Sequence, residues 1–312
     1  MTWKILVTDG LEKEGKSILE EVAEVADKKG IEAPELLEII PEYHAIIVRG
    51  RTKVNRAVLE AGKKLKVVGR MGVGIDNIDV TAAKELGITV VNCAVATSEA
   101  VAELAMGFLF GLAREIPRGD ETMKTEKFSK KELSGIELMG KTLGIVGFGN
   151  IGRLLGKYAA AMGMKILAYD EYRDAAYIHN AGAEPATLDE LLATSDFISF
   201  HLPLTPESKY MISDAAFAKM KDGVRIVDAA RGGIIEEAAL LRALESGKVA
   251  GAALDVFEKE PPVDWTLIKH PKVIATPHVG AQTEEAQLRA AVDISTEVLN
   301  ALNDQPLRWK IC

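Results

Sequence analysis

The chain of 312 residues has few cysteines, few aromatic side chains and no long hydrophobic run. Two cysteines, Cys93 and Cys312, cannot build a disulfide framework, which indicates a reducing compartment. The longest uncharged apolar run, Leu104–Ala113, is ten residues long, whereas a membrane span needs about 20. The first residues show no charged leader followed by a long apolar stretch, so no ordinary secretory signal is expected. We therefore expect a cytoplasmic protein with no membrane partner.

Neither sign of charge dominates the chain. It has 38 Lys and Arg against 46 Asp and Glu, a formal net charge of −8, and the two signs are interleaved. A surface that binds nucleic acid is therefore not expected. Hydrophobic residues make up 48% of the chain, which argues against disorder. At roughly 100–200 residues per domain, the length predicts two domains.

Short β-branched runs alternate with longer segments of helical spacing through most of the chain. This alternation predicts βαβ units around parallel sheets, so the fold class is α/β with doubly wound sheets. The expected strands are residues 4–8, 44–49, 66–70 and 88–92 in the first third, followed by 142–148, 164–170, 197–201, 224–230, 251–257 and 272–278.

Two long helices are expected outside this alternation. Ser98–Ile116 is opened by a serine and closed before Pro117. It is apolar on more than one face, which is typical either of a core helix or of a subunit interface. A last helix is expected from about Glu284 to Leu302, and its periodicity does not decide on which domain it packs.

A glycine motif follows the expected strand at 142–146 and opens a helix near Ile151. In this context each glycine has a mechanical role, namely a tight turn, close approach to a pyrophosphate and close helix–strand packing. The next strand ends at Asp170, 18 residues after the last glycine (170 − 152), where an acid would accept hydrogen bonds from the ribose of NAD. We expect NAD rather than NADP, and no metal. The motif is GFGNIG (147–152), and the cofactor contacts expected from it are Gly147, Gly149, Asn150, Ile151 and Gly152.

Three strand ends carry side chains suited to hydride transfer to a 2-keto acid. Arg231 offers a rigid fork for a carboxylate and a carbonyl. A histidine supplies a proton near neutral pH, and a carboxylate beside it would raise its pKa. The residues themselves favour His278 over His201, and they do not separate Glu258 from Glu260.

Five segments, in matching order and spacing, make the whole chain resemble the D-isomer-specific 2-hydroxyacid dehydrogenases, and among these the phosphoglycerate dehydrogenases most. They are VGRMGVGIDNID (68–79), GKTLGIVGFGNIGR (140–153), AARGGIIEE (229–237), AGAALDVFEKEPP (250–262) and TPHVGA (276–281).

The resemblance implies roles for individual residues. Arg231 would anchor the substrate, and Glu260 would pair with His278 as the general acid/base. The loop from Met71 to Gly74 would offer backbone amides, at Val73 and Gly74, to the substrate carboxylate. The implied cofactor contacts are Asn150, Ile151, Asp170, Ala229, Asp255 and Gly280.

The resemblance also implies a domain plan. A Rossmann-type NAD domain (97–283) would be inserted in a flavodoxin-like substrate domain (1–96 and 284–312). Family members are usually dimers or tetramers, so we expect a homodimer or homotetramer through the helix at 98–116. Because the sequence stops at Cys312, we also expect a short form without the C-terminal regulatory domain.

The substrate is less well defined than the chemistry. Arg49, Arg51, Lys53 and Arg70 could form a phosphate pocket, or the first three could simply be a basic loop. Three hypotheses remain. The first is oxidation of D-3-phosphoglycerate, the first step of serine biosynthesis; the second is reduction of hydroxypyruvate, glyoxylate or another anionic acid; the third is a non-catalytic NADH-sensing corepressor. Departures from the phosphoglycerate pattern are Ala94, Ala96 and Thr97 in NCAVATS (92–98), and Leu202.

Overall fold

The computed structural model describes residues 2–128 and 130–312, which form two compact units. The first unit contains the chain up to Thr97 together with Ala281–Cys312, and the second is Ser98–Gly280. Each unit is a parallel sheet covered by helices on both faces, so the predicted α/β fold class with two doubly wound sheets is confirmed. In the part of the chain that the structure describes, every helix is too short or too polar to cross a bilayer.

The sheet of the first unit has five parallel strands in the order β2-β1-β3-β4-β5. This is the flavodoxin-like order, in which the chain starts near the middle and winds outward in both directions. Most of the central strand residues are fully buried, because helices cover both faces. The strands are β1 (Trp3–Val7), β2 (Ala23–Asp27), β3 (Ala45–Val48), β4 (Val67–Arg70) and β5 (Thr89–Asn92).

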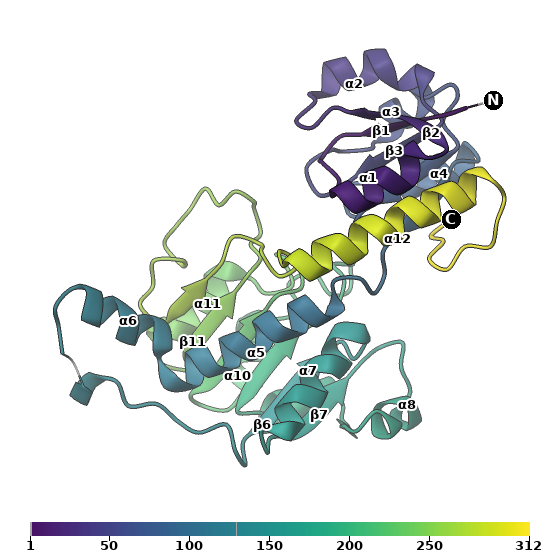
Figure 1. The fold of residues 1–312 in the computed structure, drawn as a ribbon. Coiled ribbons are helices and arrows are strands. Elements are labelled where there is room, and N and C mark those ends of the chain that lie inside the picture. Colours follow the sequence, from purple (N-terminus) through teal and green to yellow (C-terminus); the bar gives the residue numbers. More distant parts are fainter. Residues whose placement is uncertain (1, 129) are drawn as a thin grey trace. The chain divides into compact units, whose positions relative to one another are not determined.

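Two helix layers cover this sheet. The helices α1 and α12 lie together on one face (Figure 1), and α2, α3 and α4 supply the core of the other face. A Cβ at Gly15 would overlap the backbone of Ala291, so a glycine in α1 allows its close packing on α12. The helices are α1 (Lys13–Glu20), α2 (Ala33–Ile39), η1 (Ile40–Glu42), α3 (Arg56–Ala61), α4 (Val80–Glu85) and α12 (Glu284–Leu302).

The sheet of the second unit has seven parallel strands in the order β12-β11-β10-β9-β6-β7-β8. The direction of winding reverses between β6 and β9, and this reversal is where doubly wound sheets bind dinucleotides. The strands are β6 (Thr142–Val146), β7 (Lys165–Tyr169), β8 (Glu184–Pro185), β9 (Phe197–Phe200), β10 (Val224–Asp228), β11 (Val249–Leu254) and β12 (Val273–Ala275).

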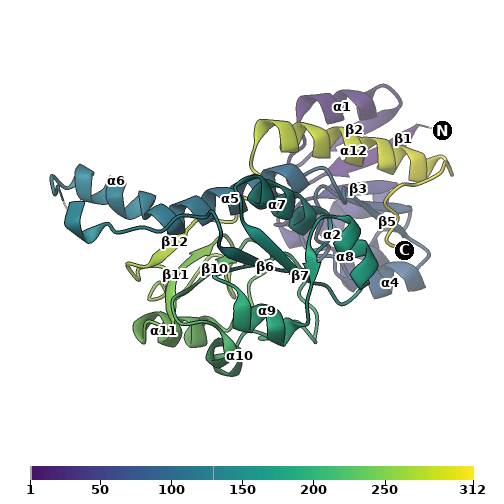
Figure 2. The same cartoon turned by 90° about the horizontal axis from the view of Figure 1, so that it is seen from below.

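Helices also cover both faces of the second sheet. The helices α9, α10 and α11 lie on one face, and α5 and α7 lie on the other (Figure 2). The helix α6 projects away from the sheet of its unit, and none of its residues is buried. The helices are α5 (Ser98–Arg114), α6 (Ile116–Lys124), η2 (Lys130–Glu132), α7 (Asn150–Ala161), α8 (Ala175–Asn180), α9 (Leu188–Thr194), α10 (Asp214–Lys219) and α11 (Glu237–Glu245).

The structure differs from the predicted elements at several places. The strands predicted at 251–257 and 272–278 end three residues early, at Leu254 and Ala275. The strands β2 and β8 were not expected; they lie at sheet edges, where one side of a strand is not covered and apolar patterning is weak. The predicted helix at 98–116 ends two residues early, at Arg114. Glu115 adopts a left-handed backbone conformation (φ 50°), which breaks the helix before α6 begins with Pro117 in its first turn.

Candidate active site

The glycine loop after β6 has the local geometry that a dinucleotide site requires. Gly147 has a φ of +93°, and a Cβ there would overlap the carbonyl of His201. A Cβ at Gly152 would overlap the Gly147 carbonyl, so this glycine permits close helix–strand packing. At Gly149 an added Cβ would meet no atom of the described residues within 4 Å, so the backbone is open to a ligand. Asn150 and Ile151 begin α7, whose N-terminal amides favour an anion.

Asp170 follows β7 and fixes the shape of this loop. One carboxylate oxygen accepts a hydrogen bond from the Phe148 amide at 2.7 Å, and the other accepts from the Tyr172 amide at 2.8 Å. Each carboxylate oxygen has a second lone pair. Asp170 can therefore hold the glycine loop and still accept hydrogen bonds from ribose hydroxyl groups. The glycine loop and the acid together fit NAD.

The loop after β12 is held by a buried carboxylate. Asp255, at the end of β11, is 1% exposed. Its oxygens accept hydrogen bonds from the Thr276 hydroxyl at 2.6 Å and from the amides of Val279 and Gly280, both at 2.8 Å. Three bonds to one carboxylate fix the backbone on both sides of His278, which adopts a left-handed conformation with a φ of 53°. The position of His278 is therefore set by Asp255.

Arg231, Glu260 and His278 come together in the second unit. Nδ1 of His278 lies 2.7 Å from Oε2 of Glu260. Because a carboxylate only accepts, we infer that Nδ1 carries a proton and that Nε2 exchanges the second proton. The side chains are 50% and 38% exposed, which leaves the imidazole accessible to a ligand. The charge of Arg231 lowers the pKa of both partners, and its turn packs on the loop of Glu260, because a Cβ at Gly232 would overlap the Phe257 carbonyl.

Pairing raises the pKa of His278 and lowers the pKa of Glu260, so each group favours its charged form. The hydrogen bond that His278 donates to Glu260 is the largest influence on the imidazole, and it raises the pKa of His278 although burial opposes it. Burial alone would raise the pKa of Glu260, but the hydrogen bond and charge of His278 outweigh burial and lower it. A histidine tuned upward in this way is protonated over more of the neutral range.

The residues between which the sequence alone did not choose, His201 and Glu258, lie in other surroundings than His278 and Glu260. His201 follows β9, and its Nε2 lies 2.8 Å from the Ser199 hydroxyl. Burial lowers the pKa of His201 to about 3, so this imidazole is uncharged near neutral pH. Glu258 does not contact His278. Its carboxylate accepts instead from the Tyr210 hydroxyl at 3.1 Å and from the Glu237 amide at 2.9 Å.

Asp228, Tyr210 and Glu237 contribute to this edge of the sheet, although the sequence did not single them out. The carboxyl group of Asp228 accepts from the Ala230 amide at 2.9 Å, and burial raises its pKa to about 7. It thereby shapes the turn that places Ala229 and Arg231 after β10. The position of Asp228 at a strand end was a detectable signal in the sequence. Tyr210 and Glu237 lie 48 and 21 residues from Glu258, the partner that they share, so spacing did not reveal them.

In the first unit, a buried aspartate organises the loop that carries Arg49. The Asp9 side chain is 5% exposed. Its carboxylate accepts from the amides of Arg49 and Thr52 and from the Thr52 hydroxyl. The Arg49 guanidinium donates to Gln282 at 3.4 Å. Arg51 donates to the carbonyl of Ile31 at 2.9 Å, so this guanidinium holds neighbouring loops together.

The loop from Met71 to Gly74 is also fixed from behind. Arg70 donates to the Met71 carbonyl at 3.0 Å, and Asn92 donates to the Val73 carbonyl at 2.7 Å. Within residues 2–128 and 130–312, the amides of Val73 and Gly74 donate to no backbone carbonyl. These amides therefore remain available to an anionic ligand.

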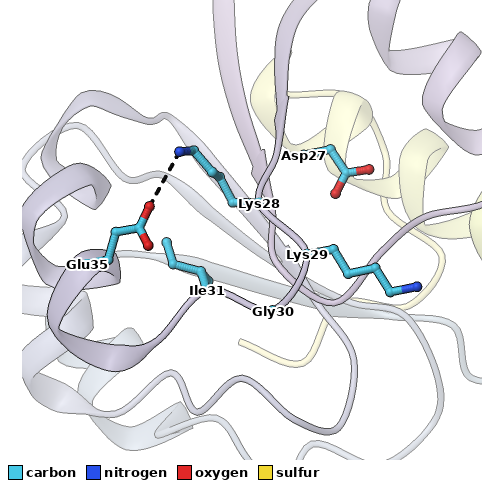
Figure 3. A pocket seen from close by; sticks show the side chains of 6 residues that line it. All are labelled: Asp27, Lys28, Lys29, Gly30, Ile31 and Glu35. Carbon is cyan, nitrogen blue, oxygen red and sulfur yellow. Dashed lines mark hydrogen bonds and ion pairs between the residues drawn. The ribbon is translucent and has the colours of Figure 1, made fainter.

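A hollow of about 530 Å³ lies on the surface of the first unit at the loop after β2. Figure 3 shows Lys28 and Glu35 on its lining, joined by an ion pair of 3.4 Å. Lys29 and Asp27 also line it. The lining includes none of the residues predicted for catalysis or for cofactor binding, so the hollow is separate from the predicted site.

Comparisons with known proteins agree with this geometry. Residues 106–280 match the model of the D-isomer specific 2-hydroxyacid dehydrogenase, NAD binding domain. The chain is 47% identical to a D-3-phosphoglycerate dehydrogenase of Methanocaldococcus jannaschii over 97% of its own length, but it spans 58% of that relative. It is also 47% identical to a hydroxypyruvate reductase of Thermotoga maritima, over 96% of this chain and 98% of the relative.

A solved structure gives the same result at the level of the fold. A glyoxylate reductase from Paecilomyes thermophila matches with a TM-score of 0.92 and 31% identity, covering 99% of this chain and 98% of that one. The family model covers more than half of the chain, and the Thermotoga relative is matched over nearly its full length. The chain belongs to the D-isomer specific 2-hydroxyacid dehydrogenases, and Ser98–Gly280 contains their NAD-binding domain.

Proposed function

We propose that the protein interconverts a D-2-hydroxy acid and its 2-keto acid with NAD as the hydride carrier. The observation that carries the proposal is the pair of His278 and Glu260 at 2.7 Å, with Arg231 close to both. An imidazole with a raised pKa, a carboxylate that orients it and a guanidinium are the groups that reduction of a 2-keto acid requires.

In the direction of reduction, His278 donates a proton from Nε2 to the carbonyl oxygen of the substrate. Glu260 stabilises the imidazolium before transfer and keeps the ring oriented. Arg231 binds the substrate carboxylate and polarises the carbonyl. A bound nicotinamide supplies the hydride in this direction and accepts it in the other. In oxidation, neutral His278 takes the hydroxyl proton through the same nitrogen.

The NAD-binding residues that we propose are those of the strand ends in Ser98–Gly280. The amides at the start of α7 would hold the pyrophosphate, and Asp170 would bind the ribose. A carboxylate at this position repels a 2′-phosphate, which favours NAD over NADP. The proposed contacts are Gly147, Gly149, Asn150, Ile151, Gly152, Asp170, Ala229, Asp255 and Gly280.

The first unit is proposed as the substrate-binding domain. The open amides of Val73 and Gly74 suit a carboxylate, and Arg49 and Arg70 suit a second anionic group. Arg51 is not included, because its guanidinium already pairs with the Asp9 carboxylate at 3.4 Å. A substrate with a carboxylate and a phosphate, D-3-phosphoglycerate, uses all of these groups.

A second candidate is the reduction of an unphosphorylated acid such as hydroxypyruvate or glyoxylate. The specific observation in its favour is the Thermotoga hydroxypyruvate reductase, which the chain matches over nearly the full length of both proteins. The chain spans 55% and 58% of two phosphoglycerate dehydrogenases that it matches.

A steady-state panel separates these candidates. Reduction with NADH is measured for phosphohydroxypyruvate, hydroxypyruvate, glyoxylate and pyruvate. We expect the highest kcat/KM for phosphohydroxypyruvate. An equal or lower value for the phosphorylated acid would establish the second candidate instead. NADH binding without turnover of any of these acids would contradict both and favour a sensor.

We propose assembly as a homodimer or homotetramer that uses α5 and the arm that follows it. Most of α5 is buried within its own unit, but Ile116, Met123 and Phe128 beyond it are 55%, 60% and 82% exposed. Such apolar side chains on a projecting arm are typical of an interface. We also propose a cytoplasmic location, since both cysteines are free.

A further inference from the structure

The turn that carries Arg231 and the loop that carries Glu260 touch through their backbones. A Cβ at Gly232 would overlap the carbonyl of Phe257 and crowd the amide of Glu258. The turn at Gly232 and the loop at Phe257 are therefore in direct backbone contact. Any displacement of one loop is transmitted directly to the other.

Glu258 joins this contact to the start of α11. Its side chain accepts from the Glu237 amide at 2.9 Å, and its own amide donates to the Glu237 side chain at 2.6 Å. Because the two bonds are reciprocal, they fix both the position and the direction of the loop relative to the helix. Two residues further on, Glu260 accepts from the Phe257 amide at 3.2 Å, so the same short loop also orients the acid that pairs with His278.

Tyr210 adds a third segment to the arrangement. Its hydroxyl donates to Glu258 at 3.1 Å, and its amide donates to the Gly233 carbonyl at 2.7 Å. Tyr210 adopts a left-handed conformation (φ 53°), which a tyrosine rarely does and which these two bonds hold in place. The hydrogen bond with Glu258 raises the pKa of Tyr210, and burial raises the pKa of Glu237.

We infer that Glu258 is a positioning residue: with Tyr210 and Glu237 it fixes the loop of Glu260 against the turn of Arg231. The inference rests on the proposed function, because it assigns a part in the same reaction. Glu258 touches neither His278 nor the reacting atoms. It acts through the place that it gives to Glu260.

The titration of His278 reports this positioning. Three charged groups act on the imidazole: Glu260 and Asp255 raise its pKa, and Arg231 lowers it. If the loop of Glu260 becomes loose, the largest of these influences weakens and the pKa of His278 falls. A side chain that only stabilised the fold would leave that pKa unchanged.

The test compares Glu258→Ala with Glu258→Gln. Glutamine keeps an acceptor for the Glu237 amide but removes the charge, whereas alanine removes both. For Glu258→Ala we expect kcat/KM of reduction to fall about tenfold and the alkaline limb of its pH profile to move down by roughly half a unit, with KM for NADH unchanged. For Glu258→Gln both quantities should stay close to wild type. Glu245→Ala, at the exposed end of α11, is the matched control.

An equal shift in the alanine and glutamine variants would overturn the inference, because the charge alone would then explain it. The absence of any shift in Glu258→Ala would overturn it too. If Glu258→Ala does not fold, Tyr210→Phe takes its place, since it removes one bond to Glu258; we expect a smaller shift in the same direction, and no shift contradicts the proposal.

Titration of His278 by NMR keeps this test apart from the proposed function. The imidazole signal, assigned by its loss in His278→Asn, gives the pKa without substrate or turnover. A protein that reduced none of the four acids would refute the proposed function, yet the NMR comparison of the Glu258 variants would still decide whether Glu258 positions Glu260.

Discussion

In each of the two units, a buried aspartate holds the loop that carries a proposed functional side chain. At the carboxyl edge of each parallel sheet, a buried aspartate accepts several hydrogen bonds from the loop that follows another strand. Asp9 does so in the first unit, where the loop carries Arg49. Asp255 does so in the second, where the loop carries His278.

The two loops differ in the side chain that each carries. In the first unit it is a guanidinium, which stays charged at every relevant pH and can bind an anion but does not exchange a proton. In the second it is an imidazole paired with Glu260, which gains and loses a proton near neutral pH. We propose that one type of loop anchor supports substrate binding in the first unit and proton transfer in the second. The chemistry resides in the side chains that the loops carry.

The largest effect should follow loss of the proton donor in the second unit. We expect His278→Asn to lower kcat by about 10²–10⁴-fold, because the variant lacks the imidazole that we propose as the proton donor. Asparagine is suitable because it tolerates the left-handed backbone of this position better than alanine does. Rates from stopped-flow absorbance of NADH provide the measurement.

Binding of NADH to His278→Asn, followed by its fluorescence, should remain within a factor of a few of wild type. Turnover close to that of the wild type would remove His278 from the acid/base role. It would also mean that the second unit is a binding edge like the first.

The sequence predicted the parts of the fold that depend on buried periodic segments. The central strands of both sheets, such as β3 and β6, are apolar throughout and were located within one or two residues. The edge strand β2 (AEVAD) was missed because only one of its five residues is buried and its pattern resembles that of a loop. The break at Glu115 was missed because a left-handed residue that is not glycine leaves no mark in the sequence.

The candidate site was predictable only where its residues lie close together in the sequence or belong to a known motif. The glycine loop and Asp170 lie within 24 residues (147–170), so their relation can be counted. Arg231, Glu260 and His278 could be placed at one edge from topology, but Glu258 and Glu260 could not be separated. That choice depends on which carboxylate the loop turns toward His278 and which toward Tyr210.

A second prediction concerns pH. It distinguishes His278 in the second unit, which titrates, from Arg49 in the first unit, which stays charged. Reduction needs protonated His278, so kcat/KM should fall as pH rises through a pKa above the ordinary value of about 6.5. Glu260→Gln should move that limb to lower pH, because the hydrogen bond and charge that raise the pKa are weakened. The same sign holds for stability: the raised pKa contributes to the folded state below about 6.5, and this contribution is lost as pH rises through the folded pKa.

The measurement is a pH profile of kcat/KM for wild type, Glu260→Gln and Arg49→Ala. Arg49→Ala serves as the control from the first unit, and it should leave the position of the limb unchanged. An unchanged limb in Glu260→Gln would show that the 2.7 Å pair does not set the titration of the general acid.

The smallest effect on activity should come from substitutions in the first unit. Arg49→Ala and Arg51→Ala should differ in their effects on KM and on Tm. Arg49→Ala should raise KM for the phosphorylated acid about five- to tenfold with little change in kcat, because the interaction is equal in the ground state and the transition state. Arg51→Ala should leave KM nearly constant and lower Tm by a few degrees, since its guanidinium bonds to the Ile31 carbonyl and lies 3.4 Å from Asp9. Lys53→Ala gives the baseline for losing one positive charge from the same loop. Equal changes of KM in all three variants would mean that the loop attracts anions only by its net charge, and the first unit would then lack the directed binding edge that its buried Asp9 supports.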